Sequence, residues 1–567
     1  MRLAILPQII SLLLVVAGLP GLTSRAAEPR DELFRFVPPD VGFCVVVQNL
    51  REHWAELSAS PFAKRWSSLP IQKKLLASKE WKEALLAVDR VCRLIDVPLP
   101  KLRDELLGDC AAFAYRPGPT DRPDQEQGLF LLRVRDEKLL ATVLEKLREL
   151  DRENPKIRHE ARDHAKQKYF QRVEGESSTF YAVQGPILIF SGQEGFLKEA
   201  MTRSARNDAG ASLARQFQAH QLESSFVGLL LNPRPWDQAV EQKSTEPSAG
   251  VSPRLWKAFQ GAGLALHLDR DVRITLSIRA TTEELPLPAQ RLLTEAARPS
   301  AIWARAPDDA LLVIASRFAL APLVETVLLA MPARTRQAAR FELDHSVSAV
   351  LGKDLFKEVL PQVGPSWGLI LTAPPSDARH LMPRATFALE VGKGNADDPI
   401  DEAMLNSLIS ATQLVVLLHN KNHRDKPIAL RSRIQEGVRV RYLEGDKAFP
   451  PGIQPACLLR DGFLVLSTSS EGLRPGKPTN MTMIKPGPLP LLRVSFRSWA
   501  AYLKEHHDEL ASLLMGRDDM SREAMQQRLD DVRSLLDLFD RLVLTQETEK
   551  GQVLFQLQVL PAASLRR

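Results

Sequence analysis

Two histidines in the segment HNKNH, His419 and His423, have the spacing closest to that of a metal site. On a helix, side chains four residues apart lie on one face, and two imidazoles on one face can bind zinc. The surrounding asparagine, lysine, arginine and aspartate residues are typical of a solvated turn. We therefore predict that this pair binds no metal.

The other histidines have simpler explanations. His159 and His164, in HEARDH, are one residue too far apart to share a helix face, and their charged neighbours predict solvated side chains. His506 and His507 follow a predicted helix and are expected to be solvated as well. His267 stands alone in a predicted hairpin, where a histidine is usually hydrogen-bonded or exposed at an edge.

Three pairs of aspartates offer carboxylates without a catalytic pattern. Asp308-Asp309 lies at the start of a predicted strand and is expected to cap a turn. Asp518-Asp519 precedes a helix, where it would cap the end and complement the helix dipole. Asp530-Asp531 lies on the polar side of a helix whose apolar stripe predicts packing inside the fold or against a partner. That stripe consists of Met525, Leu529, Val532, Leu536 and Phe539.

Known catalytic motifs give no further candidate. We assign no nucleophile elbow to the sequence, and it contains no HExxH, GxxxxGK[ST] or strand-linked GxGxxG. Aromatic residues make up only 6% of the chain, and Lys and Arg alternate with acids, which argues against nucleic-acid binding. The sequence therefore predicts no catalytic, cofactor-binding or metal-binding residue, although a catalytic triad is assembled in space and can escape such a search.

The N-terminus has the pattern of a secretory signal peptide. After Arg2, the apolar run IISLLLVVAGL is shorter than the ~20 residues that cross a bilayer. Small residues follow, and we predict cleavage near Ala26 or Ala27. Retention of the segment as a membrane anchor is the alternative. No later stretch of membrane-spanning length is free of charge, so we expect no transmembrane segment in the mature chain.

The four cysteines do not form the framework of a disulfide-rich protein. Cys44 and Cys457 lie in strand-like runs and are expected to be buried as small hydrophobic residues. Cys92 and Cys110 would be able to pair, and the sequence leaves this open. Their spacing fits no zinc signature.

The chain of 567 residues is too long for one ordinary core and is organised around a stretch that occurs twice. Residues 36–57, FVPPDVGFCVVVQNLREHWAEL, predict a Pro-Asp turn, a buried strand and a helix. Residues 304–327 repeat this order. Between equivalent positions the offset grows slowly, as a duplication with loop insertions would give. It is 269 from Asp40 to Asp309, 270 from Gly175 to Gly445, 277 from Gly195 to Gly472 and 280 from Val272 to Gln552.

The remaining patterns predict helices and strands in the same order in both halves. A helix is expected over 71–95, with several lysines on its outer side, and it would either lie on a sheet or bind a partner. Further helices are predicted over 136–150, 334–343 and 399–411. Most strands form hairpins, for example 168–174 with 179–183.

We therefore predict an α+β fold with two tandem homologous halves, each a mostly antiparallel sheet with helices packed on one face. The expected order is a signal peptide (1–27), a first half (28–285), a linking segment (286–300) and a second half (301–567).

The signal peptide, the Pro38-Pro39-Asp40 turn before a strand, and the following helix with Ser60-Pro61-Phe62 resemble a family of large exported bacterial proteins of unknown function. Members of that family often carry two such halves. The resemblance covers nearly the whole mature chain and implies architecture and compartment, but no reaction.

Two classes of function remain open. The first is an exported, non-catalytic binding, scaffolding or assembly module of the cell envelope, in the periplasm or outside the cell, with an envelope protein or ligand as its partner. The second is an exported hydrolase whose site no motif reveals. The net charge of +6, spread over 75 basic and 69 acidic residues, is weak evidence for any acidic partner.

Overall fold

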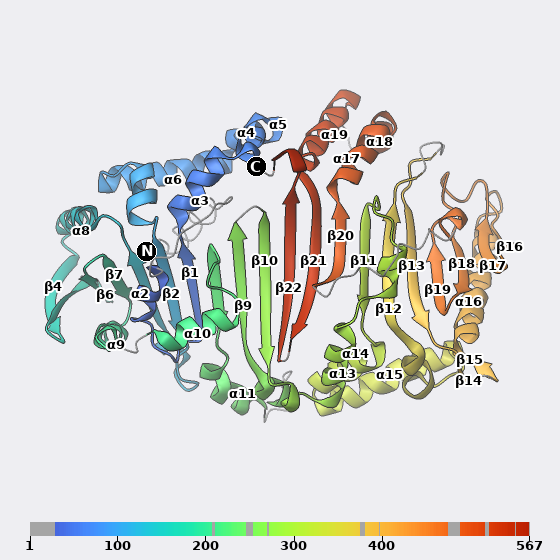
Figure 1. The fold of residues 1–567 in the computed structure, drawn as a ribbon, viewed down its shortest axis with the longest axis horizontal. Helices are drawn as coiled ribbons and strands as arrows, with labels where there is room; N and C mark the ends of the chain where they lie inside the picture. Colours follow the sequence, from blue (N-terminus) through green and yellow to red (C-terminus); the bar gives the residue numbers. More distant parts are fainter. Residues whose placement is uncertain are drawn as a thin grey trace. The chain divides into compact units, whose positions relative to one another are not determined.

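A computed structural model describes most of the chain from Pro29 to Leu565 (Figure 1). The predicted signal peptide and the pair Asp518-Asp519 lie outside the described residues. These residues are 29–206, 210–244, 253–268, 271–374, 380–395, 397–473, 488–515, 521–549 and 551–565.

The chain divides into two compact units. The first comprises Met1–Gln242, Phe259–Ala280 and Gln558–Arg567, and the second comprises Lys243–Ala258 and Thr281–Leu557. Both combine helices with antiparallel strands, which confirms the α+β class.

The first unit contains an antiparallel sheet in which strands distant in sequence become neighbours. Its strands pair in the order β4 (Ile157–His164), β5 (Gln167–Glu174), β6 (Ser177–Gln184), β7 (Ile187–Ser191), β3 (Gln127–Arg133), β2 (Cys110–Arg116), β1 (Phe43–Gln48), β8 (Val227–Leu231), β9 (Phe259–Leu268) and β10 (Val272–Ala280).

Strand β1 lies inside this sheet and pairs on both sides. Val45 is opposite Phe113 of β2 and Leu229 of β8. Successive side chains of a strand point to opposite faces. A continuous apolar run such as FCVVV therefore needs cover on both faces of the sheet.

Helices α2 (Pro29–Phe34), α9 (Glu194–Ser204) and α10 (Ala211–Ala219) cover one face. The core on this side contains Cys44 of β1 and Ala112 of β2, together with apolar residues of all three helices. It is the largest of the hydrophobic clusters described on this sheet.

The other face is covered by α8 (Glu137–Arg152) and the end of α6 (Lys79–Ile95). Their apolar residues pack with Ala111 of β2 and Leu132 of β3. The prediction of helices on one face is therefore wrong, because strands that are apolar on both sides bind a helical layer on each.

The predicted helix over 71–95 is interrupted at Ser78. The Ser78 hydroxyl accepts a hydrogen bond from the Trp81 backbone N–H and begins a new helix there. In the same way, Ser60 caps the helix that begins at Pro61, as the Ser-Pro break predicts. The remaining helices of this part are α3 (Leu50–Ala59), α4 (Pro61–Ser68), α5 (Pro70–Ala77), α7 (Leu99–Lys101) and α11 (Asp237–Ser244).

The second unit also contains an antiparallel sheet, in which Ile314 of β11 is opposite Leu369 of β12 and Leu492 of β20. Its strands pair in the order β16 (Ala429–Gln435), β17 (Val438–Glu444), β18 (Ala456–Arg460), β19 (Phe463–Ser467), β13 (Arg384–Val391), β12 (Val363–Thr372), β11 (Leu312–Arg317), β20 (Leu489–Ser495) and β21 (Phe539–Glu549), and β22 (Gln552–Pro561) follows β21.

Two helices of the second unit extend beyond their predicted ends. The helix predicted over 334–343 continues to Leu351, where Gly352 adopts a left-handed conformation and ends it. The helix predicted over 399–411 continues to Asn422. The helices here are α12 (Pro253–Ala258), α13 (Leu287–Ala296), α14 (Leu320–Ala330), α15 (Ala333–Leu351), α16 (Ile400–Asn422), α17 (Phe496–Glu505), α18 (His507–Met515) and α19 (Arg522–Leu536).

Within the described residues, α16 alone is long and apolar enough to cross a membrane, and only 17% of its most apolar window is buried. Helices of soluble proteins can pass the same criterion. The expectation that the mature chain has no transmembrane segment stays a prediction.

The turn before β2 gives a test of this packing. A Cβ atom at the buried Gly108 would overlap the backbone carbonyl oxygen of Asp104. We expect Gly108→Ala to lower the free energy of unfolding by about 1–3 kcal/mol, because backbone must shift. Gly192→Ala is the matched control, since nothing lies within 4 Å of its Cβ position. Equal denaturant midpoints for both variants would contradict the packing described.

Candidate functional site

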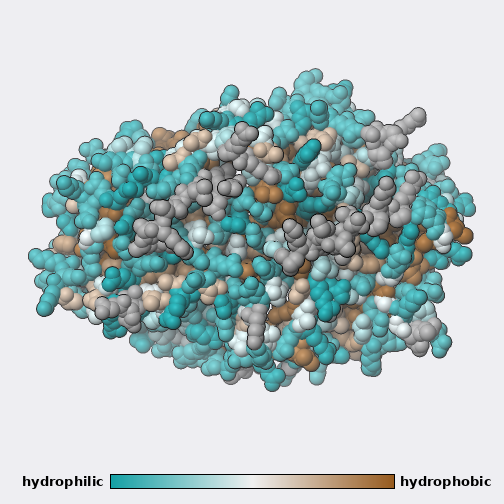
Figure 2. All heavy atoms as spheres, viewed as in Figure 1, coloured by the Kyte–Doolittle hydropathy of each residue, from teal (hydrophilic) through white to brown (hydrophobic). Residues whose placement is uncertain are grey.

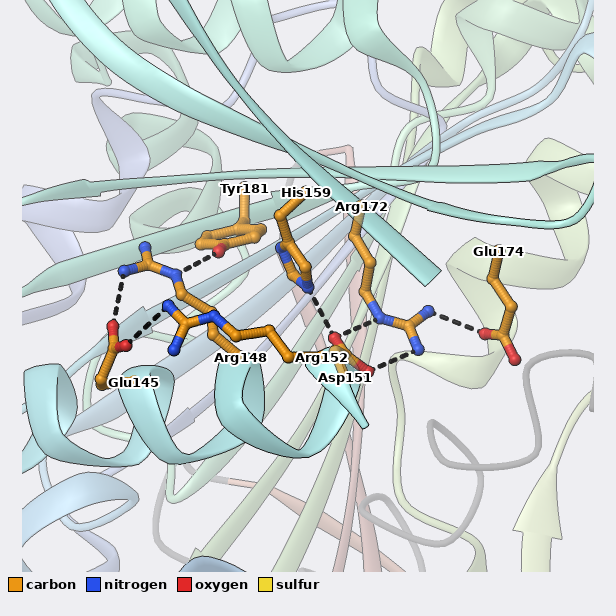
Figure 3. A network of polar contacts seen from close by, with 8 residues as sticks. All are labelled: Glu145, Arg148, Asp151, Arg152, His159, Arg172, Glu174 and Tyr181. Atoms are coloured by element: carbon orange, nitrogen blue, oxygen red, sulfur yellow. Dashed lines mark hydrogen bonds and ion pairs between the residues drawn. The ribbon is translucent and has the colours of Figure 1, made fainter. Parts of the chain in front are cut away.

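A network of polar side chains joins helix α8 to strands β4, β5 and β6 in the first unit (Figure 3). Asp151, near the end of α8, accepts hydrogen bonds from Arg172 Nε at 2.8 Å and from Arg172 Nη2 at 3.0 Å. His159 Nε2 of β4 lies 2.7 Å from the same carboxylate. Arg172 also donates to Glu174 at 2.8 Å.

Asp151 is held as a carboxylate by these partners. Burial disfavours its charged form, but the hydrogen bonds from Arg172 and His159 outweigh burial and lower its pKa. Two parallel bonds between a guanidinium and a carboxylate also fix the geometry. The pair therefore ties the end of α8 to β5.

The other half of the network is built around Arg148. Its Nε donates to the Tyr181 hydroxyl at 2.9 Å, and its guanidinium lies 4.3 Å from the centre of the Phe170 ring. Glu145, one turn earlier, pairs with Arg148 and with Arg152. Stacking on an aromatic face favours arginine over lysine here.

His159 and Asp151 have the contact that orients histidine in a hydrolase triad. In a triad the second ring nitrogen would face a serine or cysteine. Among the described residues, Nδ1 of His159 has no hydrogen-bond partner. No nucleophile therefore faces this contact among the described residues. The contact instead acts as a clamp, in which the Asp151 carboxylate holds α8 to β4 and β5. The prediction of a solvated His159 is wrong, because the segment forms β4 and the ring packs against Tyr181.

Glu194, at the start of α9, forms a second cluster. Its Oε1 accepts bonds from the Tyr169 hydroxyl at 2.5 Å and Arg162 at 3.0 Å, and it pairs with Lys198 at 2.9 Å. These contacts, the Tyr169 bond foremost, lower the pKa of Glu194 to about 2. Tyr169, Arg162 and Lys198 all bind this carboxylate, which indicates that Glu194 has a structural role.

The Pro-Asp turn before β1 is tied down by Arg116 of β2. Arg116 donates to Asp40 at 2.5 Å and to Glu199 of α9 at 2.9 Å. Its guanidinium also lies 4.7 Å from the centre of the Phe196 ring. The aspartate that marks the repeated stretch is thus a structural anchor.

A buried serine–histidine contact lies between α10 and β10. His220 Nδ1 is 2.8 Å from Ser277 Oγ, and both side chains are buried. Burial, with a smaller contribution from nearby Arg279, lowers the pKa of His220 to about 4. Ser277 has no exposed surface, so no substrate could reach this pair.

The segment GPSWG, from Gly364 to Gly368, matches the GxSxG pattern of serine hydrolases, although no nucleophile elbow is predicted there. A nucleophile elbow places its serine on a sharp turn between a strand and a helix, with the hydroxyl exposed. Ser366 instead lies within β12, opposite Arg317 of β11, and is 0% exposed. The pattern is therefore not an elbow in this fold.

A pocket of about 580 Å³ lies beside this segment in the second unit. Its polar side chains are Arg291, Arg317, Gln290 and Thr294, and none of the lining residues is a serine, histidine or carboxylate. The remaining lining residues are Leu287, Ala319, Pro322, Pro361, Val363, Gly364 and Pro365. The pocket thus has no group suited to activating a nucleophile.

His419 and His423 are brought together but form no metal site. α16 includes His419 and ends beside His423, so the prediction of a turn at HNKNH is wrong. The two rings lie 4.8 Å apart, and His419 Nε2 contacts the Lys426 carbonyl. The described residues contain no group of three or more His, Cys, Asp or Glu side chains placed to bind a metal.

Two further side chains are less exposed than predicted. His506 is buried, 3.1 Å from Glu509 and against the Tyr502 ring. Asp531 is buried too, and it accepts a hydrogen bond from Gln527. The apolar stripe of α19 packs in part on α17 and α18, which agrees with its prediction as a packing seam.

All four cysteines are free thiols. Burial raises the pKa of Cys44 to about 12 and also raises that of Cys110. The structure therefore contains no Cys92–Cys110 disulfide, and the two most buried thiols are poor nucleophiles.

The clamp at Asp151 can be tested directly. Asp151→Asn should weaken the attachment of α8 to β4 and β5 by about 1–3 kcal/mol, because Arg172 and His159 lose a charged partner. Hydrogen exchange of peptides from β4 and β5 would report this as faster opening. Glu174→Gln is the control, because Glu174 is half exposed and should matter by less than about 0.5 kcal/mol. Unchanged exchange in Asp151→Asn would rule out the clamp.

His220 should make stability depend on pH. Its pKa is below that of an unfolded histidine, about 6.5, so the unfolded chain binds the extra proton. This contribution is complete above pH 6.5 and is lost as the pH falls from about 6.5 to about 4. Melting temperatures of His220→Gln should fall less over this window than those of the wild type. His423→Gln, at an exposed histidine, should retain the wild-type slope.

Comparison with models of protein families, with curated proteins and with solved structures found no match.

Proposed function

We propose that this chain is an exported, non-catalytic binding, scaffolding or assembly module of the cell envelope, built from two homologous halves. The observation that carries the binding function is the concentration of exposed apolar side chains on a few helices. The pairing order of the strands supports the two-half architecture. The N-terminal sequence pattern supports export.

Strand pairing supports descent of the two halves from one unit. The order β4-β5-β6-β7-β3-β2-β1-β8-β9 in the first unit has the same pattern of connections as β16-β17-β18-β19-β13-β12-β11-β20-β21 in the second. Two unrelated α+β domains would rarely share a nine-strand order that has the same two pairings between strands distant in sequence, β3–β7 and β1–β8 in one unit and β13–β19 and β11–β20 in the other.

Connecting elements also correspond. Helices α3 to α6 separate β1 from β2, as α14 and α15 separate β11 from β12. A short π-helical turn precedes the second strand in each case, at Leu102–Leu106 and at Leu355–Val359. Such turns are rare, so their equivalent positions add to the argument.

Exposed apolar residues gather on the long connecting helices. On the face shown in Figure 2, hydrophilic residues predominate and hydrophobic patches interrupt them. About half of the large apolar side chains exposed in the described residues lie on α5, α6, α15 and α16. Leu86 is 58% exposed and Leu417 is 67% exposed. A concentration of exposed apolar side chains on a few helices is typical of an interaction site.

We favour binding over the alternative of an exported hydrolase. The Asp151–His159 contact has no nucleophile beside it, and Ser277 and Ser366 have no exposed surface. Charged side chains of the first unit are engaged in clamps between helices and strands. No observation on the described residues favours the hydrolase.

Site-specific photo-crosslinking in growing cells tests this proposal. A benzophenone amino acid at Leu86 or at Leu417 should give covalent adducts in the envelope fraction, because these sites face the bound partner. The same group at Glu176, an exposed residue in the β5–β6 turn, is the control and should give none. Absence of adducts from both apolar sites, or recovery of the protein only in the cytoplasm, would refute the proposal.

A further inference from the structure

The segment formed by α4, α5 and α6, residues 61–95, combines two properties. The first is positive charge. It contains eight basic and three acidic residues, a net charge of +5, whereas the whole chain has a net charge of +6. All eight basic side chains are exposed. They are Lys64, Arg65, Lys73, Lys74, Lys79, Lys82, Arg90 and Arg93.

Internal ion pairs remove little of this charge. Within the segment Arg93 pairs with Asp89 at 2.5 Å, and Lys79 lies 3.8 Å from Glu83. Both pairs are well exposed, so solvent screens them. The basic excess of the segment therefore extends into solvent.

The second property is an apolar surface that the fold leaves open. Within residues 61–95 only Leu69, Cys92 and Ile95 are buried, and Ile95 packs in the core beneath α8. Along the rest of α5 and α6, six large apolar side chains are each at least 40% exposed. They are Leu75, Leu76, Leu85, Leu86, Val91 and Leu94.

On α6 these properties are segregated in part. At 100° per residue, Trp81, Leu85, Val88 and Val91 fall on one side of the helix. The buried Cys92 and Ile95 lie on this same side, whereas Lys79, Lys82, Arg90 and Arg93 fall on the opposite side together with the exposed Leu86 and Leu94. Exposed leucines among lysines and arginines form a surface that suits an anionic membrane interface, because basic clusters on helices are attracted to anionic lipids and leucines can enter the acyl boundary.

We propose that the α4–α6 segment docks on a lipid surface that contains anionic headgroups. The basic excess complements the headgroup charge, and the exposed leucines and valine enter the acyl boundary below it. This inference rests on the proposed function, since it names the partner that binds the exposed apolar side chains of α5 and α6. An acidic protein is the competing occupant, and the experiment below separates the two.

The probe is a vesicle of phosphatidylglycerol and phosphatidylcholine in equal amounts, floated with the predicted mature chain, residues 28–567. We expect binding at low salt, weaker binding in 0.5 M NaCl because charge is screened, and little binding to vesicles of phosphatidylcholine alone. In the variant Lys73→Gln, Lys74→Gln, Lys82→Gln, affinity should fall on the order of a hundredfold, because each lysine contributes about fivefold near such a surface.

A second variant removes apolar area and leaves the charge intact. Leu75→Ser, Leu86→Ser, Leu94→Ser, at exposed leucines of α5 and of the basic side of α6, should also lose most binding. The matched control is Leu414→Ser, Leu417→Ser, Leu418→Ser on α16, a helix with exposed apolar residues but two acids in its first turn. It should bind as the wild type does. Circular dichroism would verify that each variant is folded.

Three outcomes would overturn the inference. They are no flotation at low salt, equal binding to neutral vesicles, or loss of binding in the α16 variant but not in the α4–α6 variants. If vesicles fail while the photo-crosslinker at Leu86 captures an acidic protein, the lipid surface is refuted and the binding function stands. If both experiments fail, the lipid surface and the proposed binding function are both refuted.

Discussion

The first unit depends on one constraint, the position of strand β1 inside the sheet, where its backbone pairs with β2 and with β8. Its side chains Cys44 and Val46 lie in the larger core, and Val47 on the other face packs beside Leu50 and Phe226. Because neither face can be left to water, helices must pack on both. The order of the strands then decides which helices are available. Those closest in sequence to β2 and β3 cover one face, and α2, α9 and α10 cover the other.

Charged side chains add hydrogen bonds and ion pairs to the apolar packing between helices and strands. The clamps at Asp151, Glu194 and Arg116 each connect a helix or a turn to a strand, and each uses an arginine with more than one partner. In such clamps the pKa of a carboxylate is lowered for structural reasons, as at Asp151 and Glu194. A lowered pKa in this protein is therefore no sign of catalysis by itself.

The apolar strands could be predicted because their runs of consecutive apolar residues are visible in the sequence. FCVVV forms a strand as predicted, and the similarly apolar runs ILIFS and FLVLS form strands too. Strand β4, IRHEARDH, was missed because it is almost entirely polar and is fixed by pairing with β5. Likewise, the partners of His159 and the burial of His506 and Asp531 come from tertiary contacts that no spacing in the sequence shows. GPSWG illustrates the opposite case, since a motif is visible but β12 buries its serine.

The first unit is discontinuous in sequence, and this has a consequence for biosynthesis. Its segment Gln558–Arg567 follows the second unit in sequence, and strand β22 begins in one unit and finishes in the other. The second unit must therefore be synthesised before the first unit can make all of its contacts. Until then, the part of the first unit that is made earliest lacks one segment of its fold.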